Sequence, residues 1–268
     1  MTYTFGFLGC GNMGGALAQA AAKAIPADRL AVCDADPSKT AELTRRRQAT
    51  AADAQTVARE SEYLFLAVKP QGLAALFEQI RPVLSARTDG LVLVSMAAGV
   101  SLADLRALAG FDCPVIRMMP NTPVGVGQGM ILYAANEQVT SPMLEGFLGG
   151  LSHAGRFDCI PERLIDAAGA ISGCGPAFVY LFAEALADGG VACGLPRDKA
   201  QMYAAQTLRG SAQMLLESGR HPGQLKDAVC SPGGTTIAGV RALEDAAFRA
   251  SAMNAVLAAY EKTAKLKP

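Results

Sequence analysis

The sequence predicts an α/β protein in which a doubly wound parallel sheet over residues 1–161 precedes an all-helical domain over residues 162–268. Three observations predict this fold. Short apolar runs alternate with helical patterns in the first part, and a glycine-rich turn joins the first run to the first helical pattern. After residue 162 the apolar runs stop and alanine-rich helical patterns continue. Continuous apolar strands separated by helices are typical of a parallel sheet covered on both faces.

The elements of the first part follow from local patterns. Short apolar runs predict strands over residues 4–8, 30–34, 63–68, 91–95 and 114–118. Helical spacing of apolar residues predicts helices over residues 13–24, 37–47, 72–84 and 102–108. Asp36 is the expected cap of the helix that starts at Pro37, since proline suits the first helical position.

The second part is expected to be helical over residues 178–191, 199–216, 224–229 and 247–263. The first of these helices is apolar nearly all round. Such a helix must be buried, either in a core or in an interface between subunits.

Composition excludes several functional classes. Lys plus Arg and Asp plus Glu both number 24, so the basic excess that binds nucleic acid or an anionic membrane is missing. Seven cysteines without CxxC spacing and two histidines argue against a zinc site, a thioredoxin motif and a disulfide framework. Reduced thiols favour a cytoplasmic protein. The uncharged stretches 1–22, 118–136 and 167–183 are interrupted by Gly or Pro, so we expect no membrane span and no metal centre.

The glycine-rich turn has the GxGxxG spacing of a dinucleotide site. Gly9 can make the tight turn, Gly11 lets a pyrophosphate approach the backbone, and Gly14 lets the helix pack close to the strand. Asn12 and Met13 then open a helix whose first N–H groups face the phosphates. The alternative is a purely structural glycine turn. Strand, turn and helix together predict a Rossmann-like domain that binds NADH or NADPH.

Asp34 stands at the end of the second expected strand, 20 residues after Gly14. A carboxylate there can accept the ribose hydroxyls of NADH. With Asp36 as the cap, Asp34 is expected to be free for this role, although a cap is its alternative role. No arginine adjoins it to hold a 2′-phosphate, but Lys39 is near, so the choice between NADH and NADPH stays open.

Further cofactor contacts are expected where the other strands end, because ligands bind outside the carboxyl ends of a doubly wound sheet. Lys69 can approach the phosphates or a ribose, and its alternative is a solvated lysine. The full set expected at these ends is Ala67, Val68, Lys69, Pro70, Met96, Ala98 and Asn121.

A second candidate site lies in the helical part. A tight Gly-rich loop opens onto a helix, and its N–H groups and hydroxyls can bind a carboxylate. The alternative is an ordinary capped turn. The residues of this loop are Ser231, Gly233, Gly234, Thr235 and Thr236.

These motifs, in this order, resemble the pyrroline-5-carboxylate reductase family over almost the whole chain. The matching segments are GFLGCGNMG at 6–14, LFLAVKP at 64–70, VSMAAGV at 94–100, VIRMMPNTP at 115–123, ISGCGPAF at 171–178 and LKDAVCSPGGTTIAGVRALE at 225–244. The resemblance implies reduction of the cyclic imine Δ1-pyrroline-5-carboxylate to L-proline by NAD(P)H, the last step of proline biosynthesis.

The resemblance also implies roles for particular residues. Thr236 would hydrogen-bond the ring nitrogen, Thr235 would contribute a backbone group, and the loop would hold the substrate carboxylate. Glu162 falls where the family has an acidic residue near the substrate. The helical domain would interlock with that of a second subunit, giving a homodimer or a larger ring, up to a decamer of dimers.

The residues suit imine chemistry. A protonated imine is already electrophilic, so aligning it with the nicotinamide requires no metal and no strong acid. A β-hydroxyacid dehydrogenase would need a lysine soon after Gly175, and none occurs before Lys199. A catalytically idle cofactor-binding relative is the other alternative. Four positions depart from the family pattern, namely Ala54, Cys174, Phe178 and Ala228.

Overall fold

Eight strands form one sheet in the computed structural model, which describes residues 2–46 and 48–265. The strand order is β3-β2-β1-β4-β5-β6-β7-β8. All neighbouring strands pair in parallel except β6 and β7, which are antiparallel. The order reverses between β1 and β4, which is where such sheets bind ligands. The strands are β1 (Tyr3–Leu8), β2 (Leu30–Cys33), β3 (Thr50–Ala51), β4 (Ser61–Leu66), β5 (Val92–Ser95), β6 (Val115–Met119), β7 (Gly129–Ala135) and β8 (Gly155–Cys159).

Side chains alternate between the two faces of the sheet, as the two-residue period of a strand requires. Phe5 and Phe65 are in a core on one face, where their ring centroids are 4.8 Å apart. Leu64 and Leu66, which flank Phe65 in β4, belong to the core on the other face. Both cores consist of buried apolar side chains, which explains why the strands read as continuous apolar runs.

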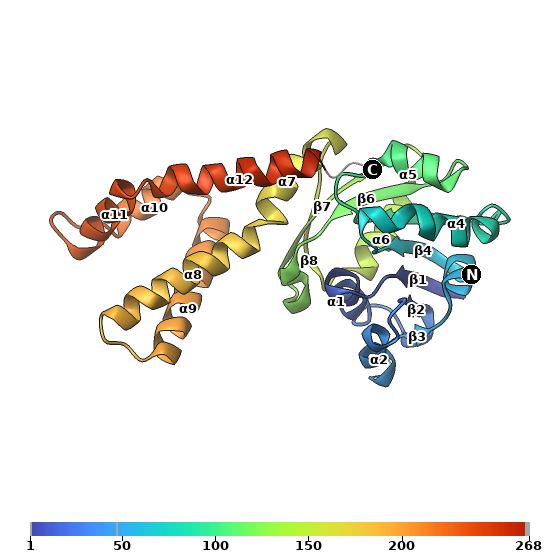
Figure 1. Ribbon diagram of the computed structural model, residues 1–268, viewed down its shortest axis with the longest axis horizontal. Helices are drawn as coiled ribbons and strands as arrows, with labels where there is room; N and C mark the ends of the chain where they lie inside the picture. The colour runs from blue at the N-terminus through green and yellow to red at the C-terminus, as the bar shows by residue number, and fades with distance from the viewer. Residues whose placement is uncertain (1, 47, 266–268) are drawn as a thin grey trace. The chain divides into compact units, whose positions relative to one another are not determined.

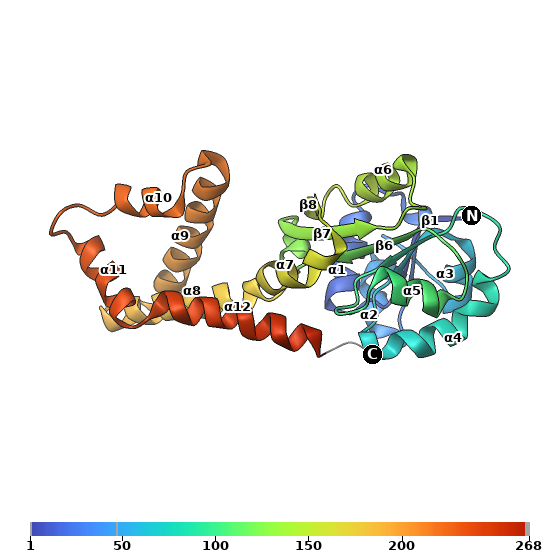
Figure 2. The same ribbon diagram turned by 90° about the horizontal axis from the view of Figure 1, so that it is seen from above.

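Helices cover both faces (Figures 1 and 2). The aromatic core packs against α1 (Asn12–Ala21), α2 (Ser38–Arg45) and α6 (Ser141–Gly150). The aliphatic core packs against α3 (Ala54–Glu60), α4 (Leu73–Leu84) and α5 (Leu102–Ala109). The remaining short elements are η1 (Ala27–Arg29), η2 (Pro70–Gly72), η3 (Thr122–Val126), η4 (Glu162–Leu164) and α7 (Ile165–Ser172).

The chain divides into two compact units. The first consists of the sheet, its helices up to Cys174 and the segment from Ala259 onward; the second is Gly175–Ala258. The second unit contains α8 (Gly175–Ala192), α9 (Arg197–Ser218), α10 (Pro222–Ala228), α11 (Thr235–Asp245) and most of α12 (Phe248–Ala264). Small side chains, Ala187 on α8 with Ala200 and Ala204 on α9, form the core between these two helices.

The predicted strands and helices are confirmed with small shifts at their ends. The expected helix over 13–24 ends at Ala21, and the one over 37–47 ends at Arg45, with residue 47 outside the described residues. The patterns did not indicate α3, α6, α7, β3, β7 or β8. β3 has two residues, and β8 contains Arg156 and Asp158 with a largely exposed surface, so neither forms an apolar run.

The second unit exposes many large apolar side chains. Tyr180 and Leu181 on α8 and Leu216 on α9 are each more than 60% exposed. The stretch Glu162–Ala192 is long and apolar enough to cross a membrane by length and composition, with 11% of its most apolar window buried. This finding differs from our expectation of no such segment. The structure interrupts the stretch at Gly173 and Cys174, between α7 and α8.

Candidate cofactor and carboxylate sites

The glycine-rich turn between β1 and α1 has the shape that a dinucleotide needs. Gly9 adopts a φ of +103°, and its N–H donates to the Cys33 carbonyl at 2.8 Å. A Cβ on Gly14 would lie 2.1 Å from the Gly9 carbonyl oxygen, so only glycine lets α1 start this close to β1. A Cβ on Gly11 would meet nothing within 4 Å. The backbone at Gly11 is therefore open to a ligand, and no side chain caps the N–H groups of α1.

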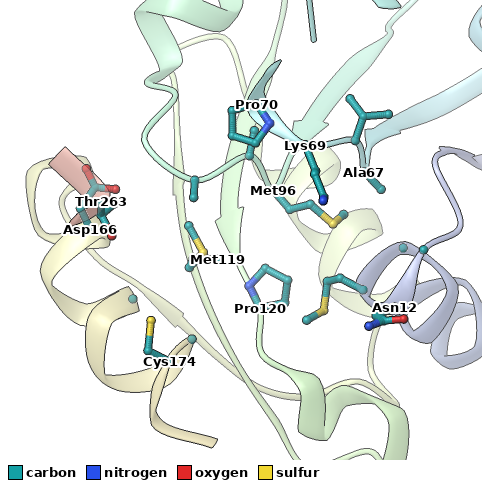
Figure 3. Close-up of a pocket in the computed structure, with 18 of the residues that line it drawn as sticks. Asn12, Ala67, Lys69, Pro70, Met96, Met119, Pro120, Asp166, Cys174 and Thr263 are labelled. Atoms are coloured by element: carbon teal, nitrogen blue, oxygen red, sulfur yellow. The ribbon is translucent and has the colours of Figure 1, made fainter. Parts of the chain in front are cut away.

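A cavity of about 610 Å³ opens beside this turn, within the first unit (Figure 3). Its volume is in the range of small-molecule and cofactor pockets. Figure 3 shows Met96, Met119 and Pro120 lying between Asn12 on one side and Cys174 on the other. The predicted residues that line it are Gly11, Asn12, Met13, Gly14, Ala67, Val68, Lys69, Pro70, Met96 and Ala98. These residues and the open turn fit a nicotinamide dinucleotide.

The cavity has further walls that sequence reasoning missed. Met119, the last residue of β6, and Pro120 lie at one of the strand ends that the sequence indicated, although only Asn121 was taken there as a contact. Asp166 and Cys174 come from α7 and the residues just after it. The other lining residues outside the predicted set are Lys39, which the sequence indicated only as a cation near Asp34, and Ala97, Gly169, Gly173 and Thr263. The strand-end rule did indicate the segment that contains Met119 and Pro120, whereas the α7 residues required the tertiary fold.

Asp34 lines a smaller cavity of about 420 Å³, together with Gly9 and Ala54. The expectation that Asp34 is free is wrong. Its Oδ2 accepts the Cys10 N–H at 2.6 Å, and its Oδ1 accepts the Asp36 N–H at 2.9 Å. Asp36 does cap α2, accepting the N–H of Ser38 at 3.0 Å. A carboxylate has about four acceptor positions, so Asp34 retains capacity for a ribose hydroxyl.

Asn121 is not among the residues that line either cavity. Its amide nitrogen donates to the Ser172 carbonyl at 2.9 Å, and its amide oxygen accepts the Met130 N–H at 2.9 Å. The side chain thus connects the end of α7 to β7. These contacts give Asn121 a structural role and do not support the predicted cofactor contact.

Glu162 also lies outside the lining of the large cavity. Its Oε1 accepts the Leu102 N–H at 2.6 Å and lies 3.4 Å from Nη1 of Arg117. Arg117 is also paired with Asp166 through Nη2. The Arg117 side chain is 4% exposed, and its Nε has no acceptor among the described residues. This Arg117–Glu162–Asp166 cluster connects the start of α5, the middle of β6 and α7 to one another.

The cysteines are free thiols. Burial raises the pKa of the Cys10 thiol to about 12, so it stays protonated beside the glycine turn at neutral pH. No group of His, Cys, Asp and Glu side chains suited to a metal ion occurs among the described residues.

The predicted carboxylate loop lies in the second unit and opens onto α11. Gly233 has a φ of +68°, and the Gly234 N–H donates to the Ser231 carbonyl at 3.0 Å. A Cβ on Gly234 would lie 2.3 Å from the Ser231 Oγ, so a larger residue there would require the Ser231 hydroxyl to turn away. Thr235 is the first residue of α11, whose N-terminus no side chain caps. The N–H groups of its first turn are thus available to an anion.

Comparison with known proteins identifies two family models along the chain. Residues 162–266 match the model described as pyrroline-5-carboxylate reductase dimerisation, and residues 4–99 match that of NADP oxidoreductase coenzyme F420-dependent. The two matches correspond to the helical part and to the sheet with its glycine turn.

Similarity also extends over complete chains. The pyrroline-5-carboxylate reductase of Pisum sativum is 41% identical, covering 99% of this chain and 96% of its own. That of Escherichia coli K12 is 42% identical, covering 99% of each chain. The crystal structure of Plasmodium falciparum pyrroline carboxylate reductase with NADP bound superposes with a TM-score of 0.88 at 34% identity, covering 99% of this chain and 98% of that one. Sequence, fold and glycine turn agree: the chain belongs to the pyrroline-5-carboxylate reductase family.

Proposed function

We propose that this chain reduces Δ1-pyrroline-5-carboxylate to L-proline with NADPH or NADH. A hydride from the reduced nicotinamide adds to the imine carbon and a proton ends on the ring nitrogen, so the products are proline and the oxidised cofactor. The open glycine turn at the mouth of the 610 Å³ cavity carries this proposal. Relatives named for this reaction, more than 40% identical over 99% of the chain, support it.

The cofactor roles follow from the geometry of the first unit. The N–H groups of Asn12 and Met13 at the start of α1 would hold the pyrophosphate, because that end carries a partial positive charge. Lys69 would approach the same phosphates. Met96 and Ala98, together with Met119 and Pro120, would form the apolar wall against the nicotinamide. The adenosine ribose would lie beside Asp34, in the smaller cavity.

The substrate roles belong to the loop of the second unit. The exposed N–H groups of Thr235 and Thr236 would bind the carboxylate, with the Ser231 hydroxyl as a further donor. The Thr236 hydroxyl would orient the ring nitrogen and relay to it the solvent proton that balances the hydride. The contacts of Glu162 support a positioning role through Arg117 and Leu102 more than direct contact with the substrate.

Self-association is part of this function. The exposed apolar side chains of α8 and α9 need a covering surface. The family model that matches residues 162–266 is described as a dimerisation model, so a second copy would cover them and account for the apolar stretch Glu162–Ala192. This match also supports a functional division at residues 1–161 and 162–268. A cytoplasmic location fits the free thiols.

The test is an assay of the purified protein with Δ1-pyrroline-5-carboxylate, following the loss of absorbance of NADH and NADPH in parallel and quantifying proline. We expect one proline for each cofactor oxidised. If the folded protein binds cofactor but produces no proline with either one, the idle-relative alternative replaces the proposed function. Omitting the imine controls for unrelated oxidation.

A further inference from the structure

Lys39 is a cation at the edge of the proposed cofactor site to which the activity assigns no role. It lies in the first turn of α2 and lines the 610 Å³ cavity. Its Nζ is 3.9 Å from Oδ1 of Asp34, which is the outer limit of an ion pair. Among the described residues that line the two cavities, Lys39 and Lys69 are the cations.

The two members of this pair are held very differently. The Asp34 side chain is 11% exposed and is fixed by the N–H groups of Cys10 and Asp36. The Lys39 side chain is 48% exposed, and a long pair of this kind contributes little free energy. Lys39 can therefore leave Asp34 at small cost, while Asp34 stays in place.

The surroundings of the pair are otherwise acidic. Asp36 caps the same helix, and Asp53 lines the smaller cavity beside Asp34. A doubly charged 2′-phosphate placed here would meet these carboxylates, and like charges at short range repel. Without a cation next to Asp34, this end of the site would reject NADPH.

We propose that Lys39 is a movable partner of Asp34 that lets one site accept both cofactors. With NADH, Asp34 accepts the ribose 2′-hydroxyl and Lys39 stays beside it. With NADPH, the Lys39 ammonium turns to the 2′-phosphate and screens it from Asp34. This proposal rests on the placement of the adenosine ribose beside Asp34 given above.

The test measures binding of adenosine 2′,5′-bisphosphate and of 5′-AMP by calorimetry, which needs no turnover. In Lys39→Met we expect the affinity for the bisphosphate to fall about tenfold, the loss of one exposed charge-assisted contact, with 5′-AMP changed less than about twofold. Arg45→Met removes a positive charge from the last turn of the same helix, away from both cavities, and should change neither affinity. In Lys39→Met, the kcat/KM for NADPH should fall in parallel with the affinity for the bisphosphate, whereas the kcat/KM for NADH should stay unchanged.

Unchanged bisphosphate binding in Lys39→Met overturns the proposal. An equal loss for both nucleotides overturns it too, because Lys39 would then act on the shared 5′-phosphate. If Asp34→Asn alters neither nucleotide, the placement of the ribose is wrong. Absence of proline formation by the wild-type protein would reject the proposed function. The nucleotide affinities would still test the role of Lys39, because calorimetry does not depend on turnover.

Discussion

The carboxylate of Asp34 joins the glycine-rich turn to the second strand by accepting the N–H of Cys10 at 2.6 Å. Its other oxygen accepts the N–H of Asp36, where the chain leaves β2 for α2. A single side chain thus fixes two loops that border the proposed cofactor site. Positioning of the turn and the proposed recognition of the ribose are combined at this residue.

Replacement of Asp34 should separate these two roles. Asp34→Asn keeps an oxygen acceptor, while Asp34→Ser shortens the side chain and loses the Cys10 contact. We expect both variants to raise the ratio of kcat/KM for NADPH over NADH by about five- to tenfold, because the carboxylate that repels a 2′-phosphate is removed. Both variants should also lower the melting temperature, serine more than asparagine, because both carboxylate oxygens accept backbone N–H groups and asparagine keeps an acceptor for only one of them. An unchanged cofactor ratio in both variants would restrict Asp34 to its structural role.

Two glycines of the turn should respond to alanine in opposite ways. The Cβ of Gly11→Ala would have open space, so the fold should keep its melting temperature while dinucleotide affinity falls at least about tenfold. The Cβ of Gly14→Ala would lie 2.1 Å from the Gly9 carbonyl oxygen, which should destabilise the fold by about 1–3 kcal/mol. Thermal unfolding and cofactor titration of both variants measure these effects. Equal cofactor affinity in Gly11→Ala and wild type would contradict the proposed pyrophosphate site.

Thr236→Val removes a hydroxyl and keeps the shape of the side chain. We expect kcat/KM for the imine to fall about 10–100-fold, equivalent to about 1.4–2.7 kcal/mol of transition-state stabilisation. Thr235→Val is the matched control, since that residue is proposed to act through its backbone N–H and should change by less than about twofold. Steady-state kinetics with saturating cofactor compares them, and equal values for both variants would remove the Thr236 hydroxyl from the mechanism.

The buried Arg117 makes the stability of the first unit sensitive to its partners. Asp166→Ala should lower the free energy of unfolding by about 3 kcal/mol, because it leaves a buried guanidinium with one carboxylate. Asp166 is 25% exposed, which places the effect near the low end for a broken buried pair. Asp112→Ala, which breaks an exposed pair with Arg106, should cost less than about 1 kcal/mol. Urea unfolding measures both, and similar losses would show that burial of Arg117 does not govern the cluster.

Much of the first unit could be predicted because its signals are local. β4 and β5 are short apolar runs. The three glycines of the turn each meet a separate steric requirement, namely the tight turn, the approach of the pyrophosphate and the close packing of the helix on the strand. Both signals can be recognised without knowledge of residues distant in the sequence. β3 and β8 escaped prediction for the converse reason. Their pairing with β2 and β7 is set by strand order, and their own residues are largely exposed.

The sequence by itself determined the α/β class, the strand–turn–helix of the cofactor site, the loop at Thr236 and, through its motifs, the family. Only the tertiary structure decided what the polar side chains do. Asp34 contacts an N–H 24 residues away, Asn121 a carbonyl 51 residues away and Arg117 a carboxylate 49 residues away. Periodicity follows from neighbouring residues, but a hydrogen-bond partner depends on which strands and helices the folded chain brings together.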